Sequence, residues 1–309
     1  MLIVFRFCGK LRKKEVNKKV KALAFGEILF DCYPAAQKIG GAPFNFCAHL
    51  AQLGGDAFLY SAVGRDELGE NALSEAGKRG IHTHYLETHS HLPTGVCKVT
   101  YQGNEPAYDL AGYCAYDEIP MLYDVCSEAF DLFYFGTLAS RSESSRKTLE
   151  TLLSVGNFET VFFDMNLRQQ YYSEELVTQG LLASNIVKMN REEFSYVKQL
   201  ALIDEPDYET ALKTIGNTYG LKTVILTLDK DGAAVWDKKQ GFFQTPAKES
   251  EFVSAVGAGD SFCACFLYHL FQGASIPQAL EKAGILSAFV ISREEAIPTY
   301  PHWLKEQLQ

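Results

Sequence analysis

The chain has 309 residues, of which 47% are hydrophobic and 22% are charged, a balance typical of a globular protein with a sizeable core. The formal net charge of -9 argues against a nucleic acid or an acidic membrane surface as a partner, because both bind basic surfaces. No run is long and apolar enough to span a bilayer. The 8 cysteines form no C-x-x-C pair, which favours buried free thiols in a reducing cytoplasm over a zinc site.

Strands and helices are predicted to alternate from Lys21 onward. Residues 1–20 are expected to be a poorly ordered basic extension, and we assign it no function. The nearly continuous apolar run "VKALAFGEILFD" predicts a strand buried on both faces of a parallel sheet. The next segment, "GGAPFNFCAHLAQLGG", predicts a helix that begins near Pro43 and ends at Gly54.

The middle of the chain departs from this alternation. A strand at 57–63 and a helix at 66–80 are followed by residues 94–112, which predict a hairpin inserted into the α/β chain. Strand and helix patterns then alternate again, and two helices at 261–272 and about 277–291 close the chain. The order of elements predicts one α/β domain whose mainly parallel sheet is covered by helices on both faces.

Polar residues follow several of the predicted strands. Asp31 follows the first strand, Asp164 and Asn166 follow "TVFF", and Asn190 follows "NIVK". Ligands of such sheets bind beyond the carboxyl ends of the strands, so these side chains are candidates for a binding site.

The stretch "VGAGDSF", residues 256–262, predicts a glycine turn that opens a helix. It is neither a Walker A loop nor a dinucleotide fingerprint, because Phe262 stands where the third glycine would be. Converging N–H groups at such a turn form an anion hole, and the adjacent Asp260 could orient a hydroxyl and take its proton. Taken alone, the stretch favours the simpler interpretation that Asp260 is the N-cap of the helix.

Several motifs in order along the chain resemble the PfkB, or ribokinase-like, carbohydrate kinases. The two most specific are "GGAPFN" near the start and "VGAGDSF" near the end, with weaker matches between them at "SAVGRDELGE", "PTG", "DMNLR", "KMNREE" and "TLDKDG". The resemblance covers about residues 21–300, and its joint order favours a catalytic Asp260 over the N-cap interpretation. It implies a three-layer α/β/α kinase domain over 21–309, with a small β-sheet lid formed around 31–40 and 92–119.

The resemblance also implies roles for individual residues. Asp260 would be the catalytic base, and Gly257, Ala258 and Gly259 would form the anion hole. The family's sugar-binding positions are occupied here by Asp31, Gly40, Gly41 and Asn45, with Arg168 as a further sugar or phosphate contact. Its ATP-binding positions are occupied by Asn190, Glu193, Thr227 and Gly232. Glu193 would act on Mg²⁺ through water, because Mg²⁺ prefers water and phosphate oxygens to a full protein cage.

Simpler interpretations remain open for these residues. Asp31 could cap a turn, Arg168 could pair with a surface acid, and the spacing of Asn190 and Glu193 also fits the start of a helix. Ser254 stands where many relatives have an aspartate beside a monovalent cation, so we expect only weak dependence on K⁺. Asp229 and Glu295 replace usual glycines near the expected nucleotide site, which leaves the nucleotide preference open.

The expected activity is ATP-dependent phosphorylation of a neutral monosaccharide, with fructose as the first candidate. "GGAP" and "DMNLR" resemble the fructokinase-like branch, and residues 98–119 carry one lysine and four acids, which does not suit a phosphorylated sugar. The alternatives are a nucleoside or 2-keto-3-deoxygluconate kinase, or a non-catalytic sugar-binding regulatory protein. A homodimer that covers the free edges of the lid is also expected.

The densest histidine group, His82, His84, His89 and His91, has two interpretations. A metal site is one, and alternation along an exposed strand is the other. We favour the second, because a fixed metal geometry with an acidic second layer of partners is not evident from the spacing.

Overall fold

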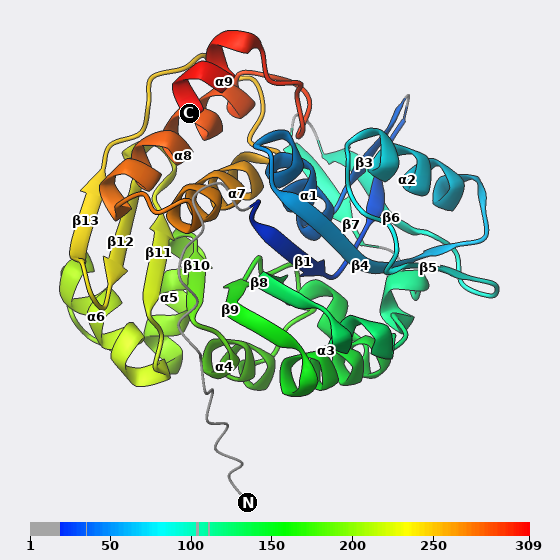
Figure 1. Cartoon of the computed structure of the whole chain (residues 1–309), viewed down its shortest axis with the longest axis horizontal. Helices are drawn as coiled ribbons and strands as arrows, with labels where there is room; N and C mark the ends of the chain where they lie inside the picture. The colour runs from blue at the N-terminus through cyan, green and yellow to red at the C-terminus, as the bar shows by residue number, and fades with distance from the viewer. Residues whose placement is uncertain (1–18, 35, 103–104, 111) are drawn as a thin grey trace, which may run out of the picture.

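The computed structural model describes residues 19–34, 36–102, 105–110 and 112–309, with only the backbone described between 101 and 108 (Figure 1). Most of the predicted N-terminal extension therefore lies outside the described residues.

The main sheet of the described chain has nine strands, and most of them are parallel. Its order is β13-β12-β11-β10-β9-β8-β1-β4-β5, and among these described strands only β12 runs antiparallel to its neighbours, β11 and β13. The strands are β1 (Lys21–Phe25), β4 (Asp56–Gly64), β5 (Leu86–His89), β8 (Ala129–Phe135), β9 (Asn157–Asp164), β10 (Ile186–Met189), β11 (Thr223–Thr227), β12 (Ala233–Asp237) and β13 (Gly241–Thr245).

Helices cover both faces of this sheet, which confirms the predicted three-layer α/β/α fold (Figure 1). One face is packed by α1 (Ala42–Gln52), α2 (Glu67–Lys78), α7 (Ala258–Phe271), α8 (Ile276–Ile291) and α9 (His302–Leu308). The other face is packed by α3 (Glu143–Val155), α4 (Glu174–Ala183), α5 (Arg191–Leu200) and α6 (Tyr208–Tyr219). The sequence pattern did not predict α9.

Central strands serve both layers of helices at once. In β1 the side chains of Ala22 and Ala24 belong to the core under α1 and α7, while Leu23 and Phe25 belong to the core under α3 and α4. Successive side chains of a strand point to opposite faces, so a strand between two helix layers must be apolar throughout. This explains the first part of the predicted apolar run. The prediction of a single strand there was wrong, because the chain turns after Phe25 and Leu29–Tyr33 forms a strand of a second sheet.

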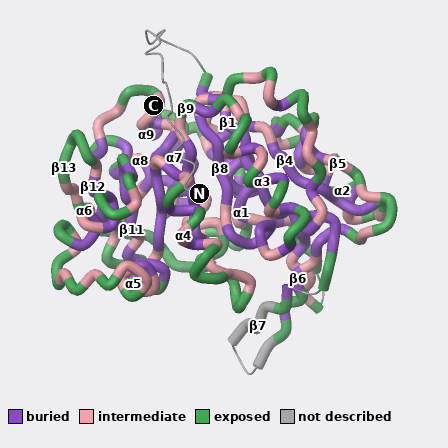
Figure 2. The backbone as a smooth tube through the Cα atoms, turned by 90° about the horizontal axis from the view of Figure 1, so that it is seen from below, coloured by how far each residue is buried: buried purple, intermediate pink, exposed green. Residues whose placement is uncertain are grey.

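A second, four-stranded sheet forms the lid. Its order is β3-β2-β6-β7, from β2 (Leu29–Tyr33), β3 (Ala36–Gly40), β6 (Gly95–Gln102) and β7 (Glu105–Asp109). The pair β2 and β6 is parallel, and the other two pairs are antiparallel. In Figure 2 the strand β6 lies at the margin of the molecule, away from the strands of the main sheet. The lid sheet carries Asp31 in the middle of β2, where it pairs with Lys38 of β3 and Cys97 of β6.

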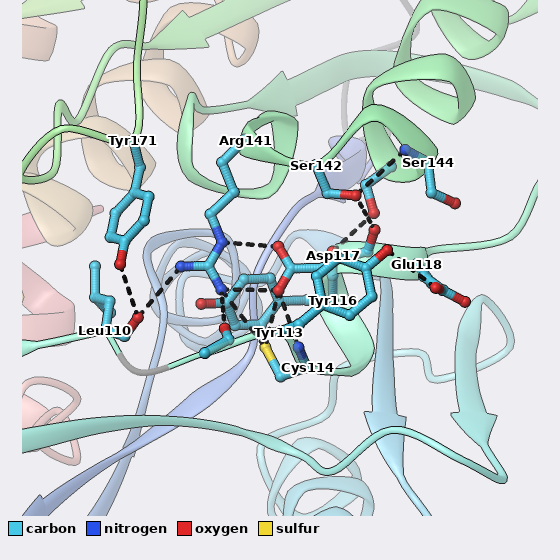
Figure 3. A network of polar contacts seen from close by, with 12 residues as sticks. Leu110, Tyr113, Cys114, Tyr116, Asp117, Glu118, Arg141, Ser142, Ser144 and Tyr171 are labelled. Carbon is cyan, nitrogen blue, oxygen red and sulfur yellow. Dashed lines mark hydrogen bonds and ion pairs between the residues drawn. The ribbon is translucent and has the colours of Figure 1, made fainter.

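A buried ion pair fixes the chain where it returns from the lid to the body (Figure 3). The side chains of Arg141 and Asp117 are only 9% and 1% exposed, and Arg141 Nε and Nη2 donate to the two Asp117 carboxylate oxygens over 2.7 and 2.8 Å. Arg141 also donates to the carbonyl of Gly112 over 2.8 Å, and its guanidinium lies over the ring of Tyr171. This bidentate geometry holds the segment after β7 firmly in place.

Candidate active site

The glycine turn before α7 forms an open helix N-terminus. Gly257 is the N-cap with φ 80°, and a Cβ at this position would lie 2.4 Å from the carbonyl oxygen of Ala296, so only glycine fits. No side chain caps α7, and within the described chain the N–H groups of Gly259 and Asp260 have no acceptor. Free N–H groups at a helix N-terminus attract anions, so this turn is a candidate anion hole.

Asp260 lies inside the first turn of α7, three residues after the N-cap, so the interpretation that it is the N-cap is wrong. Its Oδ2 accepts a hydrogen bond from Asn45 Nδ2 over 2.8 Å, which joins α7 to α1. Burial and the charge of Asp164 raise the pKa of Asp260 to about 6, against the opposing effects of Asn45, Lys188 and Arg168. A carboxylate with this pKa is a stronger base than an ordinary aspartate and is still ionised at neutral pH.

We expect kcat/KM to fall about tenfold per pH unit below about pH 6, because Asp260 must be deprotonated to act as a base. Its pKa is raised to about 6 in the folded protein, so protonation through this range removes the active form. A pH–rate profile between pH 4.5 and 8.5 measures the effect, and the residual activity of Asp260→Asn should lack this acid limb. A profile that is flat to pH 5 in the unmodified protein would contradict the assignment.

A buried ion pair between Lys188 and Asp164 lies under the first turn of α7. Asp164 was a predicted candidate for the binding site, whereas Lys188 and the pairing were not predicted. Lys188 Nζ is 3.1 Å from Asp164 Oδ1, and Tyr134 donates its hydroxyl to the same carboxylate over 3.2 Å. A Cβ on Gly259 would lie 3.5 Å from Lys188 Nζ, so the ammonium group is adjacent to the anion hole. Burial lowers the pKa of Lys188, but Asp164 and Glu193 outweigh burial and raise it. Lys188 therefore stays protonated, and its ammonium group lies beside the candidate anion hole while paired with Asp164.

A pattern in the sequence could have indicated this pair. Lys188 interrupts the apolar run "NIVKMN", and Asp164 ends the apolar run "TVFFDM" on the neighbouring strand, where the two residues are in register. Opposite charges at matching positions of two buried parallel strands predict an ion pair, because neither charge is stable alone in the core.

The predicted sugar-binding residues come from the lid, α1 and the loop after β9. Asp31 Oδ2 would be 3.3 Å from a Cβ on Gly40, so glycine at this position leaves room for the carboxylate. Burial raises the pKa of Asp31, while the Cys97 thiol and the charge of Arg168 lower it. Asn45 Oδ1 is buried without a hydrogen-bond partner among the described residues. It is an acceptor available to a sugar hydroxyl.

Arg168 is exposed, and its guanidinium makes no hydrogen bond within the described chain, although its backbone carbonyl accepts the N–H of Tyr171 over 3.0 Å. Its positive charge lies close enough to Asp31 and Asp260 to lower the pKa of both carboxyl groups. The described residues show no ion pair between Arg168 and a surface acid. The acids that its charge influences are Asp31 and Asp260, which are both candidate site residues.

Asn190 and Glu193 form a capping box at the start of α5. Asn190 Oδ1 accepts the N–H of Glu193 over 2.9 Å, and Glu193 Oε2 accepts the N–H of Asn190 over 2.8 Å. Glu193 Oε1 accepts the N–H of Leu167 over 3.0 Å, and the side chain is buried. Both carboxylate oxygens thus accept backbone N–H groups, so Glu193 is poorly suited to bind Mg²⁺ directly. Its predicted action on Mg²⁺ through water stays a prediction.

Thr227 and Gly232 border the loop after β11, beside the anion hole end of the sheet. Thr227 donates its hydroxyl to the carbonyl of Met189 over 3.4 Å, which links the ends of β10 and β11. Gly232 has φ 94°, and a Cβ there would lie 2.0 Å from the carbonyl of Thr245. The loop geometry requires this glycine, and the nucleotide contact predicted for both residues stays a prediction.

The clustered histidines point to separate acidic partners. His82 Nε2 is 2.6 Å from Asp56, and His84 Nε2 is 2.6 Å from Asp124. Among the residues that the structure describes, no group of three ligating side chains could hold a metal ion. No helix within the described ranges has the length and apolar character needed to cross a membrane.

This fold and site define a class of protein, the sugar kinases that have an aspartate at a glycine-rich helix N-terminus. Residues 16–303 match the family described as pfkB family carbohydrate kinase, and the chain belongs to that family. The family that the sequence motifs predicted is therefore confirmed.

Relatives within the family carry different activities in their names. The chain is 26% identical to a 5-dehydro-2-deoxygluconokinase of Geobacillus thermodenitrificans, over 96% of this chain and 90% of the relative. Its structure is similar to fructokinase with bound ATP from Xylella fastidiosa, with a TM-score of 0.80 at 19% identity, over 93% and 97% of the two chains. It is also similar to a Vibrio cholerae fructokinase with bound fructose, ADP and calcium, with a TM-score of 0.78 at 19% identity, over 94% and 99%. At such identities the structural likeness shows the fold alone.

Proposed function

We propose that the protein transfers the γ-phosphoryl group of ATP to a hydroxyl of a neutral monosaccharide, with fructose as the first candidate. The observation that supports this most strongly is the desolvated carboxylate of Asp260 beside the uncapped N–H groups of α7. A base and an anion hole in one helical turn suit phosphoryl transfer, where positioning and charge stabilisation dominate.

Each residue has a definite task in the proposed reaction. Asp260 orients the attacking hydroxyl and takes its proton, while Asn45 holds the Asp260 carboxylate through the 2.8 Å hydrogen bond. The N–H groups of Gly259 and Asp260, with Lys188 nearby, stabilise the negative charge of the transferring group. Asp31 on the lid can accept hydrogen bonds from two sugar hydroxyls, because a carboxylate has two acceptor oxygens.

The local charge favours a neutral substrate. The charge of Arg168 lowers the pKa of both Asp31 and Asp260, so the three side chains lie in one electrostatic environment. The guanidinium of Arg168 makes no hydrogen bond among the described residues. An acidic sugar would have to approach the carboxylates of Asp31 and Asp260, and like charges in a poorly solvated site repel strongly. Of the other two cations that act on these carboxyl groups, Lys188 is already paired with Asp164 and Lys38 donates to the carbonyl of Glu294.

A second candidate substrate is an acidic keto sugar such as 5-dehydro-2-deoxygluconate or 2-keto-3-deoxygluconate. Two observations favour it: the exposed Arg168, whose guanidinium has no hydrogen-bond partner in the described chain, and the 5-dehydro-2-deoxygluconokinases among the sequence relatives. Arginine binds carboxylates through two parallel hydrogen bonds, so Arg168 would recognise the acid group of such a sugar.

An ATP-consumption assay against a panel of sugars, acidic keto sugars and nucleosides tests the proposal. We expect the highest kcat/KM with fructose, and only a several-fold change in the fructose KM for Arg168→Met, because a neutral sugar offers Arg168 no charge. If the substrate is acidic, the same variant should raise its KM by about 10²-fold. Turnover of the acidic sugars alone would overturn the fructose proposal, and no turnover on the whole panel would favour a sugar-binding regulatory protein.

We further propose that the reaction depends only weakly on K⁺ and that a second copy of the chain covers the lid. Ser254 accepts the N–H of Val256 over 3.2 Å with its hydroxyl, so its neutral oxygen is already engaged. The lid sheet ends in β3 and β7, and exposed strand edges are favoured sites of pairing between chains.

A further inference from the structure

The N-terminus of α1 lacks an ordinary cap. Its N-cap residue is Gly41 with φ 108°, no N-cap side chain accepts a hydrogen bond there, and the first turn contains no acidic residue. A Cβ on Gly41 would lie 2.5 Å from the carbonyl oxygen of Glu27, so a serine or aspartate cannot replace this glycine. The close approach that the site needs at Gly41 therefore excludes the usual means of capping the helix.

Glu27, from the connection between β1 and β2, supplies the missing cap. Its Oε1 accepts the N–H of Ala42, the first residue of α1, over 3.1 Å, and the residue is only 3% exposed. The preceding Gly26 packs against Pro43, where an added Cβ would be 2.6 Å from Pro43 Cγ. The connection thus lies directly against the first turn of α1. A carboxylate at this end of a helix is also favoured by the helix dipole.

The turn that Glu27 holds is the turn that presents Asn45 to the catalytic base. The N–H of Asn45 donates to the carbonyl of Gly41 over 2.9 Å, and its side chain donates to Asp260 Oδ2 over 2.8 Å. A displacement of the first turn of α1 would therefore move the group that orients the Asp260 carboxylate.

We propose that Glu27 is a positioning residue for the phosphoryl transfer, because its carboxylate holds the first turn of α1 so that Asn45 stays in contact with Asp260. This inference rests on the proposed kinase function. The positioning role also explains why a carboxylate lies buried within the apolar run "FGEILF". A buried carboxyl group is costly unless it is hydrogen-bonded, and Glu27 accepts the Ala42 N–H.

Two substitutions at Glu27 separate positioning from simple support of the fold. Glu27→Gln keeps an oxygen that can accept the Ala42 N–H, so its kcat should stay within several-fold of the unmodified protein. Glu27→Ala removes the acceptor, and its kcat should fall by about 10²-fold with little change in the KM for ATP. The matched control is Asp207→Ala, which removes the cap of α6, where Asp207 accepts the N–H of Thr210 over 2.8 Å. It should lower the melting temperature without changing kcat.

Crystal structures of the two Glu27 variants provide a readout that does not depend on activity. In Glu27→Ala the separation between Asn45 Nδ2 and Asp260 Oδ2 should exceed hydrogen-bonding distance, and in Glu27→Gln it should remain close to 2.8 Å. An unchanged contact in Glu27→Ala, or a kcat that falls no more than in Asp207→Ala, would overturn the inference. If the unmodified protein phosphorylates no sugar, the proposed function fails, and the two structures still decide whether Glu27 positions Asn45.

Discussion

Replacing Asp260 by asparagine is expected to lower kcat by about 10³- to 10⁴-fold, because the amide cannot take the proton of the sugar hydroxyl. The amide oxygen can still accept the hydrogen bond from Asn45, so the site should keep its shape. The pKa of Asp260 is raised to about 6 from an ordinary value of 3.8, which means that the ionised form is disfavoured in the folded protein. Removing this charge should therefore stabilise the protein at pH 7, by at most about 3 kcal/mol.

Steady-state kinetics and thermal unfolding of the same sample measure both effects. The informative result is their combination, a large loss of kcat with an unchanged or higher melting temperature, since a misfolded variant would lose both. Equal kcat values for the two proteins would remove Asp260 from the chemistry. A lower melting temperature at pH 7 would show that the charged carboxylate is stabilising, contrary to its raised pKa.

Replacing Arg141 by leucine is expected to destabilise the protein by about 3–5 kcal/mol, because it leaves the Asp117 carboxylate charged and unpaired at 1% exposure. The variant also loses the hydrogen bonds from Arg141 to Asp117 and to the carbonyl of Gly112. Urea or thermal unfolding checks the magnitude.

Two further variants test the stated cause of that loss. Combining Arg141→Leu with Asp117→Asn removes the uncompensated charge, so the double variant should be more stable than the single one. Lys147→Met disrupts an exposed ion pair with Glu143, both side chains being 70% exposed, and should leave stability unchanged. A loss of the same size in Lys147→Met and Arg141→Leu would show that burial of the Arg141 pair is not what matters.

The layers of the fold could be predicted from the sequence because its strands and helices have distinct apolar patterns. The mainly apolar runs that become β1 and β11 belong to strands of the main sheet, and the hairpin predicted at 94–112 is present as β6 and β7. The run at 20–30 was predicted as one strand, but its last residues belong to β2 of the lid sheet. The short helix α9 was missed, because seven residues offer too few turns for an apolar repeat.

The candidate site was predictable where one short motif fixes the backbone, and not where distant side chains meet. The stretch around Gly257 predicts an open helix N-terminus, since the glycine conformation and the following helix are local features. The contact of Asn45 with Asp260 spans 215 positions in sequence, and the pairing of Lys188 with Asp164 depends on strand register. The capping role of Glu27 could not be predicted from the sequence, because it depends on the close approach of Gly41 to the backbone carbonyl of Glu27.

The proposed sugar-binding groups are divided between two sheets, which has a consequence for the choice between sugar and water as the phosphoryl acceptor. Asp31 belongs to the lid sheet, whereas Asn45 and Asp260 belong to helices packed on the main sheet. Water is smaller than any sugar, so it could reach Asp260 without a hydrogen bond to Asp31 on the lid. In the proposed reaction, the choice between a carbohydrate and a wasteful hydrolysis of ATP therefore depends on how firmly the two sheets are held against each other.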